Sequence, residues 1–241
     1  MSWANRHPWR GEPWIEPKKA VALQKKLASR VREERGPAKI TRVCGVDIGV
    51  RGDLARAALC VYRFPELELL EVRTAVRPLE FPYIPGLLAF REVPAILEAY
   101  RKLETEPDVL LVDGHGLAHP RRFGSACYLG VELDRPAIGC GKSLLCGSHR
   151  EPGPKRGAQT QLLDGKERIG FCVRTREGVK PVYISVGHRL ELVRCVKIIL
   201  ACTPRYRLPE PIRAADRAAG TMDETGCVPA DVIEKLRIPA S

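Results

Sequence analysis

The sequence has no long hydrophobic run and no apolar leader. Apolar stretches such as Val109–Val112 are too short to span a bilayer, which takes about 20 apolar residues. Residues 1–19 mix tryptophan, proline, arginine and glutamate and contain no apolar segment of the kind that directs secretion. We therefore expect neither a membrane protein nor a secreted one, and we expect a cytoplasmic location.

The nine cysteines also lack any pattern of their own. They include no C-x-x-C pair and no zinc-ligand spacing. Four of them, Cys44, Cys60, Cys140 and Cys172, lie inside apolar, strand-like runs. This distribution predicts small buried thiols in a reducing compartment, and it argues against a disulfide framework or a zinc centre.

What the sequence does have is a globular composition and a strong positive charge. A chain of 241 residues with 44% hydrophobic and 29% charged residues can bury one sizeable core. With no repeat and no clear domain boundary, we expect one domain over residues 1–241, a monomer, with peripheral tails at 1–14 and 220–241. The net charge of +11 favours a polyanionic partner, although thermostable proteins also carry many surface arginines and lysines.

The order of periodic segments predicts an α/β fold. Leu23, Leu27 and Val31 recur at a spacing of four, which indicates a helix that starts at Pro17. Strand-like runs over 40–50, 54–63 and 67–76 have short links, which favour antiparallel neighbours. Further elements are expected as helices over 87–104, 123–133 and 190–202, a last helix containing Asp216, and strands over 109–112, 137–140, 169–175 and 181–186. Residues 147–165 are expected to form an exposed loop, and the whole order predicts a mixed central sheet with flanking helices.

Acidic residues occur where apolar ones belong. Asp47 lies inside the strand-like run Val43–Gly49, where an unpaired carboxylate would cost on the order of tens of kcal/mol in an idealised apolar interior. Asp113 ends the strand over 109–112 and precedes a glycine-rich turn, the position at which α/β sheets bind ligands. Glu92 falls beside the apolar stripe of its helix. Asp216 is a weaker candidate, equally well explained by a surface ion pair.

Any one of these acids could be a paired core or cap residue, but together they indicate a metal site. Two carboxylates some 4 Å apart repel by roughly 4 kcal/mol at an effective dielectric constant of 20. A divalent cation turns that repulsion into binding, and a set of oxygen ligands favours Mg²⁺ or Mn²⁺ over zinc. The chemistry that such a site favours is metal-assisted phosphodiester hydrolysis.

Basic and aromatic residues accompany the acids. His119, Arg121 and Arg122 follow the Asp113 turn and could contact phosphate, although a lone histidine is more often structural. Lys142 ends another strand, on the same sheet edge as Asp113 if the strands are parallel, where it could stabilise negative charge or simply be solvated. The stiff segment Pro82-Tyr83-Ile84-Pro85-Gly86 could be a wedge that enters a base stack, or a tight turn with its tyrosine packed down.

In this order the motifs closely resemble the endonuclease V family, over roughly residues 15–216. They are Val46-Asp47-Ile48-Gly49, Pro82-Tyr83-Ile84-Pro85-Gly86, Ala89-Phe90-Arg91-Glu92, the run from Val112 to Gly124, Ile138-Gly139 with Lys142, Ser185-Val186-Gly187-His188-Arg189 and Arg207-Leu208-Pro209-Glu210-Pro211. The resemblance implies a ribonuclease H-like fold and hydrolysis of the second phosphodiester 3′ to an inosine, with Mg²⁺ or Mn²⁺. It implies 3′-hydroxyl and 5′-phosphate ends and a role in the repair of deaminated adenine in DNA.

The resemblance also implies roles for single residues. Asp47 and Asp113 would be the principal metal ligands, Glu92 the third acid, and Asp216 stands where some members carry aspartate and others histidine. Lys142 and His119 match residues near the scissile phosphate, and Tyr83 would fill the gap left by the displaced base. The hypoxanthine pocket would involve Gly86, Leu88, Gly114, Gly124 and Ser125, largely through backbone groups that read the flipped base. Cys140-Gly141 departs from the Val-Ala that commonly precedes the lysine, which leaves substrate details open.

Two other functions remain open at this point. The chain could be a ribonuclease that cuts inosine-containing RNA, although the intact Pro-Tyr-Ile-Pro segment favours DNA; discrimination at the sugar depends on contacts to the 2′-hydroxyl. It could also bind inosine or branched DNA without cutting it. Three clustered acids argue against a pure binder, because they repel phosphate.

Overall fold

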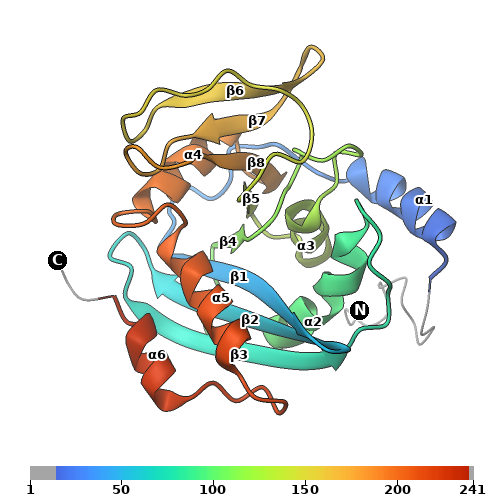
Figure 1. The fold of residues 1–241 in the computed structure, drawn as a ribbon, viewed down its shortest axis with the longest axis vertical. Helices are drawn as coiled ribbons and strands as arrows, with labels where there is room; N and C mark the ends of the chain where they lie inside the picture. Colours follow the sequence, from blue (N-terminus) through green and yellow to red (C-terminus); the bar gives the residue numbers. More distant parts are fainter. Residues whose placement is uncertain (1–14, 239–241) are drawn as a thin grey trace.

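Eight strands and six helices make up the described part of the chain, residues 15–238 of the computed structural model (Figure 1). The strands are β1 (Arg42–Arg51), β2 (Leu54–Arg63), β3 (Leu69–Pro78), β4 (Val109–Val112), β5 (Ala137–Gly141), β6 (Gln159–Asp164), β7 (Glu167–Val173) and β8 (Val182–His188). The helices are α1 (Pro17–Ala28), α2 (Leu88–Arg101), α3 (Ser125–Leu133), α4 (Leu192–Ala201), α5 (Glu210–Thr221) and α6 (Ala230–Leu236).

All eight strands form one mixed sheet in the order β3-β2-β1-β4-β5-β8-β7-β6. The first three form the antiparallel meander that the short links predict, with Asp47 opposite Ala58. β4 and β5 then run parallel to β1, and β8, β7 and β6 continue antiparallel to the far edge. The parallel strands β1, β4 and β5 lie at the centre of the sheet, so their carboxyl ends share one edge.

Helices cover both faces of the sheet (Figure 1). Strand side chains alternate between the faces. In β4, Val109 and Leu111 join the core under α4, α5 and α6, whereas Leu110 and Val112 join the core with α1, α2 and α3. Such a doubly covered strand is continuously apolar, as β4 is. Because side chains alternate between the two faces, the position of a polar residue in β1 or just beyond β4 determines which helices it faces.

The predicted mixed sheet with flanking helices is confirmed, but two sequence-based expectations are wrong in part. The helix that contains Asp216, α5, was expected to be the last, but α6 follows it. The segment 147–165, expected as a loop, contains strand β6, which pairs with β7. β6 is an edge strand in which only Leu162 is fully buried while Gln159 and Gln161 are exposed. It therefore has no apolar alternation in its sequence, and pairing with β7 makes it a strand.

The tail after residue 220 packs against the sheet as far as it is described. Met222, Val228 and Leu236 are buried in the core under α5 and α6, and the Tyr62 hydroxyl donates a 2.7 Å hydrogen bond to the Leu236 carbonyl. Residues 1–14, expected to be a peripheral tail, and residues 239–241 lie outside the described residues. No helix within residues 15–238 has the length and hydrophobicity to cross a membrane.

Seven of the nine cysteines are buried, as the sequence predicts, whereas Cys146 is half-buried and Cys227 is exposed. All nine are free, and the four in strand-like runs, Cys44, Cys60, Cys140 and Cys172, are buried in the sheet. Burial raises the pKa of the Cys172 thiol to about 11 and that of Cys140 to about 12, so both are neutral at physiological pH.

Candidate active site

Two carboxylates lie side by side where the parallel strands β1 and β4 meet. Val46 is paired with Val112 across these strands, and the Asp113 N–H donates a 3.1 Å hydrogen bond to the Val46 carbonyl. Asp113 thus continues the ladder one residue beyond β4, next to Asp47. The pairing of two strands far apart in sequence places both acids at one point of the sheet.

Asp47 faces helix α5 because a glycine lets the helix approach the strand. Gly45 lies two residues before Asp47 and on the same face. A Cβ on Gly45 would stand 1.9 Å from the carbonyl oxygen of Pro211, at the start of α5. This approach brings Asp216, further along α5, into hydrogen-bonding contact with the Asp47 carboxyl.

Glu92 joins the same acids from helix α2. Its carboxyl interacts with the hydroxyl of Ser125, the first residue of α3, and the negative charge of Asp113 acts on it. Burial and that charge raise the pKa of Glu92 to about 8. The structure therefore brings together all four acids that the sequence singled out, from β1, α2, α5 and the end of β4.

Lys142 supplies positive charge at the acids. It follows strand β5, and its ammonium group hydrogen-bonds Oδ2 of Asp113. Burial lowers the pKa of Lys142, but the bond to Asp113 and the attraction of the neighbouring acids outweigh this and raise it. Arg207 holds the segment in place by donating to the Lys142 carbonyl and, at 2.8 Å, to the Pro181 carbonyl. The sequence analysis gave Arg207 no role, although it stands in one of the quoted motifs.

The electrostatics of the cluster favour a bound cation. Burial first, then the charge of Asp113, raise the pKa of Asp47 to about 8. Burial also raises the pKa of Asp113, and repulsion by Asp216 adds to this despite Lys142 and Arg207. These acids resist ionising together without added positive charge, and carboxylate oxygens are the donors that Mg²⁺ and Mn²⁺ prefer. Within residues 15–238, however, no three His, Cys, Asp or Glu side chains are already arranged to hold an ion.

His115 packs against both neighbours of Lys142. Its ring fills the space beside Gly141, where a Cβ would lie 2.3 Å from Cε1 of the imidazole, and it hydrogen-bonds the backbone of Ser143. Burial lowers the pKa of His115, so the ring is neutral at pH 7. Its role in placing Lys142 was missed from sequence because it depends on a contact between two separate loops.

A second polar cluster surrounds Gly86, at the end of the Pro82–Gly86 segment. Gln24 of α1 donates to the carbonyls of Gly86 at 3.1 Å and Phe123 at 2.8 Å. Arg121 donates to the same Gly86 carbonyl at 2.6 Å and to Oε1 of Gln24. Gln24 was not singled out from sequence, but a polar residue between Ala20 and Leu27 on the buried face of α1 is the detectable sign.

His119 lies in this second cluster. Its Nδ1 accepts the Arg121 N–H at 3.1 Å, and its ring hydrogen-bonds the backbone of Gly86. Burial, reinforced by the charge of Arg121, lowers the pKa of His119 to about 4, so the imidazole is neutral at pH 7. Arg122 is held elsewhere, by ion pairs with Asp164 at 2.8 Å and Glu167 at 2.7 Å at the β6–β7 turn.

The expected wedge stands out from the surface. Tyr83 is 69% exposed, with Pro82 and Pro85 also exposed and Ile84 half-buried against the α1–α3 core. Leu88 is exposed nearby, while Gly114, Gly124 and Ser125 line the turn beside Glu92. A Cβ on Gly124 would stand 2.2 Å from the His115 carbonyl oxygen, so this part of the turn is tightly packed. The tyrosine is thus not packed down, contrary to the tight-turn alternative.

The fold and the acids define a protein of the ribonuclease H-like class. The sequence model of the endonuclease V family matches residues 25–217. An endonuclease V of Roseiflexus sp. (strain RS-1) is 49% identical over 209 residues, which are 86% of this chain and 94% of that protein. The crystal structure of endonuclease V from Streptomyces avermitilis superposes with a TM-score of 0.83 at 43% identity, over 86% of this chain and 92% of that one.

A second similar structure holds nucleic acid. Endonuclease V of Ciona intestinalis, in complex with a 24mer DNA containing an inosine followed by a ribo-adenosine, has a TM-score of 0.73 at 26% identity. It covers 84% of this chain and 95% of its own. The present chain belongs to the endonuclease V family and is a nuclease.

Proposed function

We propose that this protein is a metal-dependent endonuclease that hydrolyses the second phosphodiester bond 3′ to a deoxyinosine in DNA, and so initiates repair of deaminated adenine. The products would carry 3′-hydroxyl and 5′-phosphate ends. The observation that carries the proposal is the cluster of Asp47, Glu92 and Asp113 with Lys142 at the carboxyl ends of the central strands. The Ciona relative, which binds inosine-containing DNA, supports the substrate class.

We assign the metal to the acidic cluster. Asp47 and Asp113 would be the principal ligands of Mg²⁺ or Mn²⁺, with Glu92 and Asp216 nearest to complete the set. When bound, such an ion neutralises phosphate charge and activates water. The raised pKa values of Asp47 and Glu92 fit this assignment, because a cation would favour the ionised carboxylates that burial disfavours.

The remaining groups would position the substrate. The ammonium group of Lys142, which pairs with Asp113, would contact a non-bridging phosphate oxygen of the substrate. Tyr83 would fill the space left by the flipped base, and the backbone near Gly86, Gly114 and Gly124 would contact hypoxanthine. The hydrogen bonds from Gln24 and Arg121 to Gly86 would keep the wedge at a fixed distance from the acids.

The test is an end-labelled cleavage assay on one deoxyinosine in single- and double-stranded DNA and on the RNA counterpart, with Mg²⁺, Mn²⁺ or EDTA. We expect a metal-dependent cut at the second phosphodiester 3′ to inosine, faster in DNA. Faster cleavage of RNA would assign the enzyme to RNA turnover. No cleavage of any substrate would leave a binding protein as the better description.

Two variants separate catalysis from binding. Asp47→Ala and Asp113→Asn should abolish cleavage and retain binding to the inosine strand, because they remove ligands and leave the wedge intact. Asp53→Asn, in the exposed β1–β2 turn, is the matched control and should cleave normally. Full activity in either active-site variant would refute the metal assignment.

A further inference from the structure

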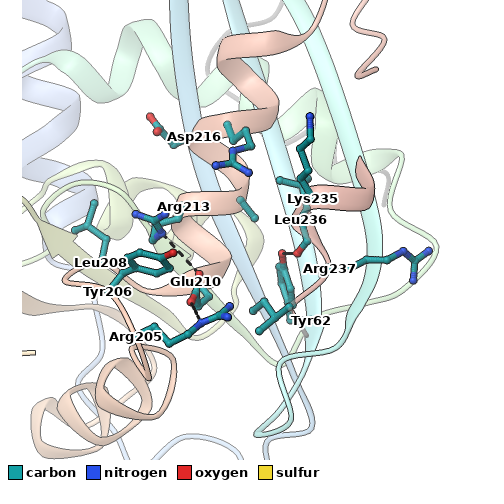
Figure 2. Close-up of a pocket in the computed structure, with 13 residues that line it drawn as sticks. Tyr62, Arg205, Tyr206, Leu208, Glu210, Arg213, Asp216, Lys235, Leu236 and Arg237 are labelled. Atoms are coloured by element: carbon teal, nitrogen blue, oxygen red, sulfur yellow. Dashed lines mark hydrogen bonds and ion pairs between the residues drawn. The ribbon is translucent and has the colours of Figure 1, made fainter. Parts of the chain in front are cut away.

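A basic pocket adjoins the acidic cluster on the α5 side of the sheet. It has a volume of about 470 Å³ and lies between α5, α6 and the segment 205–208 (Figure 2). Its lining includes five cationic side chains and one exposed aromatic ring: Arg205, Arg213, Arg217, Lys235, Arg237 and Tyr206. The function proposed above assigns none of these residues.

The pocket keeps an excess of positive charge. Its two carboxylates are Asp216 and the buried Glu210, which pairs with Arg205 at 3.2 Å and Arg213 at 3.6 Å. Arg217 forms no ion pair with any residue of 15–238, while Lys235 and Arg237 pair only with exposed acids of their own helix. Such exposed pairs are worth little and exchange readily with another anion. Three cations are therefore available to a ligand.

One exposed aromatic ring, that of Tyr206, lies among these cationic side chains. Tyr206 is 38% exposed, and the guanidinium carbon of Arg213 stands 3.6 Å from its ring centroid (Figure 2). Glu210 fixes Arg213 in that position through its ion pair. An aromatic ring stacked with arginine, beside free cations, suits a nucleobase with its phosphate.

The pocket is continuous with the acids. Asp216 lines it and also hydrogen-bonds Asp47, so a strand bound at the acids would lie next to the pocket. Arg213 lies one helical turn before Asp216 on α5. A docking site for an acidic protein would use the cations but would not need the accessible ring or the link to the acids.

We propose that this pocket binds a nucleotide of the substrate strand on one side of the scissile bond, with its base on Tyr206 and its phosphates on Arg217 and Arg237. The proposal rests on the proposed function only in taking the substrate to be a nucleic-acid strand. It extends the substrate contacts beyond the inosine, the wedge and the acids to the C-terminal part of the chain.

The test is fluorescence-anisotropy binding of single-stranded DNA to the full chain in EDTA, over a range of salt concentrations. Arg217→Ser with Arg237→Ser should lower the dependence of log K on log salt by about 1.4, because each lost phosphate contact on a single strand accounts for about 0.7. The matched control, Arg35→Ser with Lys39→Ser, removes the same charge from the exposed segment leading into β1 and should leave the slope unchanged.

Stacking is tested separately at Tyr206. Tyr206→Ala should weaken binding about 5- to 150-fold, which corresponds to the loss of one base–aromatic stack, and Tyr206→Phe should retain affinity. The inosine strand is used at full length and truncated on either its 5′ or its 3′ side. The defects should disappear with one truncated strand and persist with the other.

Equal slopes for the pocket and control variants, or a defect that persists with both truncated strands, would overturn the proposal. Melting temperatures of all variants exclude misfolding as the cause. The wild-type preference for inosine over adenine strands, measured in the same assay, tests the proposed function independently. If wild type showed no preference for inosine, the proposed function would be in error, but the comparison of pocket and control variants would still test the pocket.

Discussion

Replacing Gly45 with alanine should separate α5 from the sheet and with it Asp216 from Asp47. A Cβ there would lie 1.9 Å from the Pro211 carbonyl oxygen and 2.1 Å from its carbon, against 3.4 Å for ordinary contact. Both obstacles are backbone atoms, so α5 must move away by about 1.5 Å, the difference between 3.4 and 1.9 Å. No rotation of a side chain can relieve the clash.

Two effects of different size should follow from Gly45→Ala. Forcing a group into a packed core costs about 1–3 kcal/mol, or roughly 2–12 °C in melting temperature for a chain of this length. Misplacing an active-site group by about 1 Å can cost on the order of 100-fold in rate. We therefore expect cleavage to fall much more than stability, with the loss seen while the protein is still folded.

The matched control lies on the same strand and the same face. A Cβ on Gly49 would stand 3.4 Å from the Ala219 carbonyl oxygen of α5, within ordinary contact, so Gly49→Ala should change neither melting temperature nor cleavage appreciably. The assays are thermal unfolding and end-labelled cleavage of an inosine strand. If Gly45→Ala behaved like Gly49→Ala, the account of how α5 completes the acidic cluster would be wrong.

Three further results are expected. Without metal, the raised pKa of Glu92 means that its contribution to stability is complete below about pH 4.5 and is lost as the pH rises through about 8. Glu92→Gln should therefore have a higher melting temperature than wild type at pH 9, and the difference in melting temperature should close at pH 4. A difference that stays constant with pH would contradict the raised pKa. Tyr83→Ala should lower selectivity for inosine over adenine in the cleavage assay because the exposed ring is the wedge, whereas unchanged selectivity would remove that role. Gln24→Met should cost about 1–3 kcal/mol by leaving the Phe123 carbonyl and Nε of Arg121 unpaired, and should also lower selectivity because Gly86 would keep only the hydrogen bond from Arg121; a loss of stability alone would mean that Gln24 does not support the wedge.

The sequence by itself predicted the types and order of the elements other than β6 and α6, and it singled out the acids of the candidate site. Periodicity located the strands of the central sheet, because a strand covered on both faces is continuously apolar. It also exposed Asp47 and Asp113, since a carboxylate inside or directly after such a run is costly without a partner. The order of the motifs supplied the family, which the comparisons confirm.

The tertiary structure decided what depends on contacts between distant segments. Strand β6 is a strand through its pairing with β7, and its own sequence carries no alternation. Gln24 meets Gly86 and Phe123, and His115 meets Gly141, across loops that no local pattern connects. Local propensity and burial depend on residues that are close in sequence. The packing of α5 on Gly45, and with it the basic pocket next to Asp216, depends on contacts between segments far apart in the chain.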